Sequence, residues 1–177
     1  RNIGQLKIKA YPFVGYGKMI KSINEYYETS MDILNKEVRE ALFNKNQPIY
    51  TKNKDTTPTR YLSNAKITNS FIADGCVIDG TVENSIVARS VRIKKGTVIK
   101  NSIILQQSDI GENVHLKNVI LDKKVIVRDD KELVGTSEFP IVVGKGRIIY
   151  YLNRFFILLK KPPSGFLFSE FVIRTAS

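Results

Sequence analysis

The sequence has very little cysteine and histidine, no tryptophan and no long apolar run. With one Cys and one His among 177 residues, it can form neither an internal disulfide nor a Cys/His zinc cluster. No stretch approaches the roughly 20 apolar residues that a membrane-spanning helix needs. The most apolar stretch, 148–159, is shorter and contains Arg154. These absences predict a protein of a reducing compartment, which we expect to be the cytoplasm, with no membrane partner.

Charge is unbalanced, with 28 Lys and Arg against 17 Asp and Glu and a formal net charge of +11. Such a surplus attracts anions. The basic residues are scattered, however, and the chain has no RNA-binding aromatic motif, zinc finger or Arg-rich arm. We therefore expect a solvated basic surface and no nucleic-acid partner, while sites for small phosphorylated ligands stay open. The chain begins at Arg1 without an initiator Met, so we expect it to be a piece of a longer protein.

An internal repeat runs through the middle of the chain. The motif Asn-Ser-Phe-Ile at residue 69 recurs as Asn-Ser-Ile-Val at residue 84 and Asn-Ser-Ile-Ile at residue 101, with a fainter copy at residue 118. These copies lie 15, 17 and 17 residues apart, and aliphatic residues recur inside them with a period of six. The predicted inward-facing core positions are Ile72, Ile78, Val87, Ile93, Ile99, Leu105, Ile110 and Leu116.

A period of six fits neither a 3.6-residue helix nor an alternating hairpin. It fits a short strand followed by a sharp corner, repeated three times to close one coil of a prism, with successive coils stacked roughly 4.8 Å apart. Asn at the same corner of each coil tolerates a left-handed backbone and can form a ladder of amide hydrogen bonds. We therefore predict a mainly β fold, a hexapeptide-repeat parallel β-helix of between four and five coils over residues 65–146. Known hexapeptide β-helices are left-handed.

The flanking segments have a different character. Ser22 and Glu25 are spaced as a capping box, and the helix that it starts has an apolar stripe of Ile23, Tyr26, Tyr27, Met31 and Leu34. We expect Asn35 to end this helix and to cap a short second helix through Phe43. Residues 6–11 alternate like a strand. Residues 44–64 are expected to be an extended linker, and the apolar tail at 147–177 is expected to pack on the β-helix and against a neighbouring subunit.

Few residues could carry chemistry. The chain shows no identifiable nucleophile–base pair, carboxylate dyad or phosphate loop, and Gly144-Lys145-Gly146 lacks the spacing of a P-loop, so we expect a turn there. His115 is expected to point outward, since Val114 and Leu116 on either side are predicted to face inward. In hexapeptide acyltransferases such a histidine acts as a general base, which keeps that class as an alternative. Cys76 occupies an inward position and is expected to be buried and inert.

Several blocks of the chain, in the right order, resemble bacterial glucose-1-phosphate adenylyltransferase, also called ADP-glucose pyrophosphorylase. Residues 11–16 (YPFVGY) and 26–34 resemble the end of its nucleotidyltransferase domain, 48–51 the start of its linker, and 73–80, 119–123 and 140–146 its C-terminal β-helix. The resemblance covers residues 8–146 and implies that residues 1–43 are the remnant of an α/β nucleotidyltransferase domain. It also implies an oligomeric complex that uses Mg²⁺ and joins ATP and glucose 1-phosphate into ADP-glucose and pyrophosphate for glycogen synthesis.

The resemblance fails at one loop. Where catalytic members read Gly-Tyr-Trp-x-Asp-(Ile/Val)-Gly-Thr, this chain has GYGKMIKS at residues 15–22, so Gly17 replaces the aromatic and Met19 replaces the acid. In the family that acid helps to hold the divalent metal, and a thioether is a poor ligand for a hard ion. We therefore expect no catalytic, cofactor-binding or metal-binding residue in this chain.

The resemblance, with these departures, implies a regulatory or assembly subunit that is inactive alone. Its expected partner is a catalytic glucose-1-phosphate adenylyltransferase subunit in a homo- or hetero-oligomer, and ATP and Mg²⁺ belong to the parent complex. A subunit of another sugar-phosphate nucleotidyltransferase with the same layout is a further alternative. The segment 13–16 (FVGY) before a capped helix disfavours the acyltransferase alternative, because an acyltransferase has no use for it.

Overall fold

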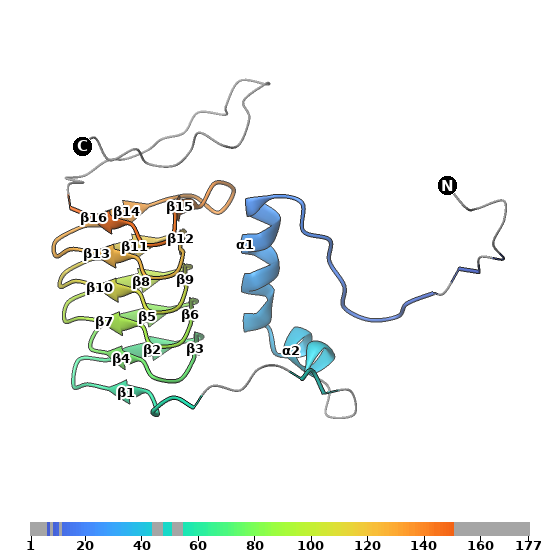
Figure 1. Ribbon diagram of the computed structural model, residues 1–177, viewed down its shortest axis with the longest axis horizontal. Coiled ribbons are helices and arrows are strands. Elements are labelled where there is room, and N and C mark those ends of the chain that lie inside the picture. Colours follow the sequence, from blue (N-terminus) through green and yellow to red (C-terminus); the bar gives the residue numbers. More distant parts are fainter. Residues whose placement is uncertain (1–6, 8, 11, 44–47, 51–54, 151–177) are drawn as a thin grey trace, which may run out of the picture.

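The computed structural model describes residues 7, 9–10, 12–43, 48–50 and 55–150, and its strands form three parallel sheets that wrap into one prism (Figure 1). The first sheet has six strands in the order β1 (Arg60–Tyr61), β4 (Val77–Ile78), β7 (Arg92–Ile93), β10 (Asp109–Ile110), β13 (Ile126–Val127) and β16 (Ile148–Ile149). The second has five, namely β14 (Glu132–Val134), β11 (His115–Lys117), β8 (Val98–Lys100), β5 (Thr81–Glu83) and β2 (Lys66–Thr68). The third has five, namely β15 (Ile141–Val143), β12 (Val119–Leu121), β9 (Ile103–Ile104), β6 (Ile86–Val87) and β3 (Phe71–Ile72). This arrangement is the parallel β-helix that the repeat predicts.

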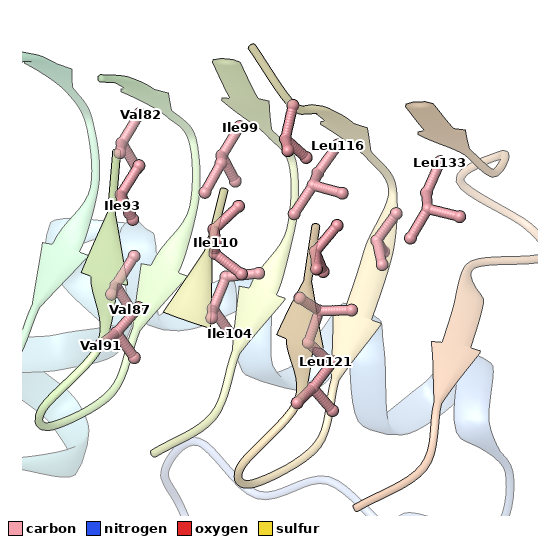
Figure 2. Packing of buried hydrophobic residues seen from close by; sticks show 14 of the residues in the cluster. Val82, Val87, Val91, Ile93, Ile99, Ile104, Ile110, Leu116, Leu121 and Leu133 are labelled. Atoms are coloured by element: carbon pink, nitrogen blue, oxygen red, sulfur yellow. The ribbon is translucent and has the colours of Figure 1, made fainter. Parts of the chain in front are cut away.

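The core lies inside the prism, where aliphatic side chains of successive coils stack on one another (Figure 2). The register pairs Ile78 with Ile93, Ile93 with Ile110, and Ile110 with Val127. Each coil therefore buries its apolar side chains against its neighbours rather than in a core of its own. Six predicted core residues are at most 1% exposed, namely Ile78, Val87, Ile93, Ile99, Ile110 and Leu116.

The predicted inward position of Leu105 is wrong. Its neighbour Ile104 faces inward and is fully buried, while Leu105 packs with Ile103 in a second cluster outside the prism. The period of six fails at the corner between the second and third sheets, where the step between inward residues takes five positions, as from Val82 to Val87 and from Ile99 to Ile104. Ile72 does pack against the core, but it is only partly buried because β3 is the terminal strand of its sheet.

Most corners of the coils turn through a residue in the left-handed region. Between the second and third sheets these residues are Asn69, Asn84, Asn101 and Asn118, with φ between 43° and 52°. Asn tolerates this conformation better than most side chains. The predicted ladder of amide hydrogen bonds forms only between the first two of these asparagines, where Asn69 Nδ2 donates to Asn84 Oδ1 at 2.7 Å. No hydrogen bond between two side-chain amides joins the later described asparagines of this corner.

Serine hydroxyls continue the ladder instead. Ser70 Oγ accepts from Ser85 N, Ser85 Oγ from Ser102 N, and Ser102 Oγ from Val119 N, each at 3.1 Å. Ser85 and Ser102 are fully buried. A buried backbone N–H that lacks a hydrogen-bond partner destabilises the fold. The serine of the Asn-Ser motif provides that partner for the backbone N–H of the next coil, at a corner where the strands no longer pair.

The helical segment precedes the prism. Helix α1 (Ile23–Met31) begins at the predicted capping box, with Ser22 as N-cap and Glu25 reaching back to the backbone. A single 3₁₀ turn, η1 (Asp32–Leu34), leads into α2 (Lys36–Leu42), and the Asn35 side chain caps α2 by accepting from Glu37 N at 2.9 Å. None of the helices in the described ranges is long and apolar enough to cross a membrane.

The predicted boundaries of the prism need correction at both ends. Strand β1 lies inside 44–64, predicted as linker, because Arg60 N and Leu62 N donate to the Cys76 and Ile78 carbonyls. Strand β16 likewise lies inside 147–177, predicted as tail, and pairs with β13. Pairing of exposed strand edges explains both extensions. The predicted packing of the tail beyond residue 150 falls outside the described residues.

The stretch 6–11, predicted as a strand, is described only in part. Lys7, Lys9 and Ala10, which are the described residues of this stretch, are not in a strand. A strand needs a hydrogen-bonding neighbour, and no described strand pairs with these residues. The remaining residues of the stretch lie outside the described part of the chain.

Candidate functional site

The outer face of the third sheet is apolar and lies beside helix α1 (Figure 1). Strand β9 places Ile104 inside the prism and Ile103 outside, and β12 places Ile120 outside between the inward Val119 and Leu121. Strands covered on both faces have continuous apolar sequences rather than alternating ones, which explains runs such as Ser-Ile-Ile-Leu at 102–105. The residues of this helix–sheet junction are Tyr26, Tyr27, Met31, Ile86, Ile103, Leu105, Ile120 and Val142.

Tyr27 is the centre of the junction. Its side chain is 5% exposed and packs between α1 and the outward Ile103 and Ile120. Its hydroxyl donates to the backbone carbonyl of Asn101 at 2.6 Å and lies 3.3 Å from Asn118 Oδ1. Burial raises the pKa of Tyr27, so the hydroxyl stays protonated and acts as a donor. The buried ring thus sets how closely α1 approaches the third sheet. The hydrogen bond of the hydroxyl sets the position of α1 along that sheet.

A second set of contacts ties the segment before α1 to the end of that helix. Tyr16 donates a hydrogen bond from its hydroxyl to Asp32 Oδ2 at 2.8 Å, and Lys18 forms an ion pair with the same oxygen. The hydrogen bond from Lys18 is the main cause that lowers the pKa of Asp32, and the bond from Tyr16 lowers it further. The loop that departs from the catalytic pattern is therefore held against the C-terminal end of α1.

The structure places Met19 on the surface of this loop, with 72% of the residue exposed. No group of three or more His, Cys, Asp or Glu side chains within the described ranges is arranged to hold a metal ion. A thioether does not suit Mg²⁺. Met19 therefore does not supply the ligand that the catalytic pattern has at this position. Phe13, Val14 and Ile20 of the same segment are also exposed.

The other chemically distinctive residues are dispersed over the prism. His115 is exposed on β11 between Val98 and Glu132 of the neighbouring strands, and no described residue is hydrogen-bonded to its ring. Cys76 is 1% exposed inside the core, and burial raises the pKa of its thiol. Lys145 and Gly146 form the turn that leads into β16. None of these residues belongs to the helix–sheet junction.

Sequence reasoning did not single out Tyr27, because the helical stripe presents Tyr26 and Tyr27 as equivalent apolar positions. Which ring is buried depends on the angle at which α1 meets the third sheet, and a helical pattern does not contain that angle. For the outward Ile103 and Ile120, the sequence did contain a pattern that could have identified them as buried against the helix. Each stands directly before an inward aliphatic, which is typical of a strand covered on both faces.

Comparison with known proteins gives consistent results. The hexapeptide-repeat family described as GlmU-like, C-terminal hexapeptide, matches residues 56–138. The glycogen biosynthesis protein GlgD of Bacillus subtilis is 43% identical over 143 residues, which is 81% of this chain and 42% of GlgD. A glucose-1-phosphate adenylyltransferase of Fervidobacterium nodosum is 33% identical over 133 residues, 75% of this chain and 32% of that protein. One of Desulfitobacterium hafniense is 34% identical over 122 residues, 69% of this chain and 31% of that protein.

The chain thus spans between 31% and 42% of the length of these curated relatives. The family match at 56–138 covers the prism from β1 to β14, and the matches to GlgD and to the adenylyltransferases, at 122 to 143 residues, are longer than that family match. The chain is a homologue of GlgD and of the glucose-1-phosphate adenylyltransferases and corresponds to their C-terminal, hexapeptide-repeat part.

Proposed function

We propose that the chain is the C-terminal part of a non-catalytic subunit of a glucose-1-phosphate adenylyltransferase. In this role it serves assembly and regulation of a cytoplasmic complex that makes ADP-glucose for glycogen synthesis. The catalytic partner subunit holds ATP and Mg²⁺ and forms the bond between ATP and glucose 1-phosphate. The prism supplies a rigid body, and α1 connects that body to the segment that bears the altered loop.

The observation that carries the proposal is the exposed Met19 in the altered loop. The catalytic pattern that this segment resembles has an acid at that position, and a thioether cannot take over its role toward a divalent ion. The identities agree with this assignment, since the chain is 43% identical to GlgD and 33% or 34% identical to two proteins named as the adenylyltransferase.

Two features favour a role in assembly. The prism buries most of its core between successive coils, which makes it a rigid body that can present a surface to another subunit. The segment before α1 exposes Phe13, Val14, Met19 and Ile20 close together in sequence. Exposed apolar groups that cluster in this way mark contacts with other protein surfaces. A neighbouring domain or subunit would cover them.

Co-expression of the longer polypeptide that we expect to contain this chain with the catalytic adenylyltransferase of the same organism tests the proposal. Size-exclusion chromatography with light scattering should give one species that contains both proteins. A matched variant with Phe13→Ser and Val14→Ser should weaken that species, whereas Lys117→Ser on an exposed face of the prism should not. Separate elution of the two wild-type proteins would contradict the proposal.

A further inference from the structure

The last coil of the prism contains an insertion. In other coils the inward residue of the second sheet is followed five positions later by the inward residue of the third, as from Leu116 to Leu121. From Leu133 to Val143 the same step takes ten positions. The extra residues form a loop, 135–140, between β14 and β15 (orange in Figure 1).

Both ends of this loop are fixed on Asn118. Ile141 N donates to the Asn118 carbonyl at 3.0 Å, and the Asn118 Nδ2 amide donates to the Gly135 carbonyl at 3.0 Å. The approach is too close for a side chain at Gly135, where an added Cβ would lie 2.6 Å from the Asn118 carbonyl oxygen. Gly135 N also donates to the Lys117 carbonyl at 2.8 Å, so the Asn118 side chain is one of two groups that hold this end of the loop.

The same asparagine contacts helix α1. Asn118 is 7% exposed, and its Oδ1 lies 3.3 Å from the Tyr27 hydroxyl. An amide has its acceptor and its donors on opposite sides. Only one orientation of the Asn118 amide places Oδ1 toward Tyr27 and Nδ2 toward Gly135. The Tyr27 hydroxyl has one proton, which it donates mainly to the Asn101 carbonyl and shares with Asn118 Oδ1 as a weaker second acceptor. Loss of the hydroxyl alone leaves a buried oxygen without a donor, and withdrawal of the helix exposes the amide to water, so either change allows the amide to rotate.

We propose that Asn118 couples the packing of α1 on the third sheet, which we call its seated state, to the conformation of loop 135–140. When α1 is seated, Tyr27 holds the amide in the orientation that anchors Gly135. When α1 leaves, the bond from Asn118 Nδ2 to the Gly135 carbonyl is lost, the backbone bonds at the two loop ends remain, and the loop fluctuates more. The middle of the loop is held by two contacts, from Thr136 N to the Phe139 carbonyl at 3.2 Å and from Phe139 N to Thr136 Oγ1 at 3.0 Å. Phe139 is 42% exposed, so a partner that contacts the loop can act on α1 through the same link.

The coupling goes beyond the proposed function and stands without it, because it concerns contacts inside this chain. Hydrogen exchange measured by mass spectrometry on the whole chain tests it. In Tyr27→Phe, the amides of residues 135–141 should exchange roughly fivefold faster, as expected for the loss of about one hydrogen bond. In the control Tyr26→Phe, which keeps both the Tyr27 hydroxyl and the apolar cluster, they should exchange as in the wild type.

Coupling must also act in the reverse direction. Gly135→Ala should speed the exchange of the α1 amides, whereas the control Gly144→Ala should not, because a Cβ added at Gly144 meets nothing within 4 Å. If Gly135→Ala unfolds the last coil, Thr136→Ala replaces it. Loop exchange that is the same in Tyr27→Phe and Tyr26→Phe would overturn the proposal. So would α1 exchange that the loop variant leaves unchanged.

Discussion

The hydroxyl of Tyr27 donates a hydrogen bond to the backbone carbonyl of Asn101, 2.6 Å away and 74 residues later in the sequence. This bond joins a helix that precedes the repeats to a corner in the middle of the prism. Asn101 has a left-handed backbone with φ of 45°. A corner that turns the chain of the β-helix therefore also supplies an acceptor for the helix that covers it.

Removal of apolar contacts beneath Tyr27 should release α1 without unfolding the prism. We expect Ile103→Ala to raise the rate at which a protease cuts residues 23–31, because Ile103 packs on the outside against the helix. The strands should remain protected, since their core is elsewhere. Limited proteolysis followed by mass spectrometry measures both. Cleavage in the strands at the same rate as in α1 would contradict the separate roles of the two clusters.

The corrected register of β9 predicts different effects for two adjacent residues. Ile104→Ala should lower the free energy of unfolding by about 2–5 kcal/mol, as for other large buried aliphatic residues. Leu105→Ala should cost clearly less, because Leu105 is only partly buried on the outer face. Urea denaturation followed by far-ultraviolet circular dichroism compares the two. Equal losses of unfolding free energy in the two variants would show that the assignment of Ile104 as inward and Leu105 as outward is wrong.

The strand–corner repeat was predictable from this chain because its inward aliphatic residues and its Asn-Ser corners recur at nearly constant spacing. The place of Leu105 was not, because loss of one residue at a corner shifts the inward position without changing the apolar character of Ile103, Ile104 or Leu105. The ends of the prism were also missed. The strands β1 and β16 form because a neighbouring strand offers its edge, and that is a property of the folded prism rather than of local sequence.

The candidate site was less predictable than the fold. Sequence identified the altered loop through Gly17 and Met19, and the structure then placed Met19 on the surface. The contacts of Lys18 and Tyr16 with Asp32 join residues 14 and 16 positions apart. No repeat or helical periodicity relates such pairs. They depend on how the loop folds back along α1.

The left-handed corners predict a specific order among substitutions of Asn84. Its φ is 43°, where a β-branched side chain is disfavoured and glycine is not. We expect Asn84→Val to lower the free energy of unfolding by about 1–2 kcal/mol and Asn84→Gly to lower it by less. Thermal and urea unfolding of the two variants provide the measurement. If glycine and valine cost the same, the hydrogen bond from Asn69 rather than the backbone conformation would determine the choice of asparagine.

The contacts of Asp32 predict a pH dependence of known sign. Its pKa is lowered, mainly by the hydrogen bond from Lys18, so the fold favours the ionised carboxylate. This stabilisation is complete above the pKa of an unfolded aspartate and is lost as the pH falls through the lower pKa of the folded state. The difference in Tm between wild type and Asp32→Asn should therefore be constant from neutral pH down to about pH 5 and should shrink at lower pH.

Lys18→Met provides the control for this experiment, since it removes the partner and leaves the carboxylate. We expect its Tm difference from Asp32→Asn to be smaller than that of the wild type at neutral pH and to vary less as the pH falls. A wild-type difference that grows on acidification would show that the ion pair is not formed in solution.

Pyrophosphate release from ATP and glucose 1-phosphate in the presence of Mg²⁺ tests the account most directly. The assay compares the longer polypeptide that we expect to contain this chain, the catalytic adenylyltransferase of the same organism, and the co-purified pair. We predict no release above background from the polypeptide alone, and a higher turnover by the pair than by the catalytic protein alone. Robust turnover by the isolated polypeptide would contradict the non-catalytic role that the exposed Met19 supports.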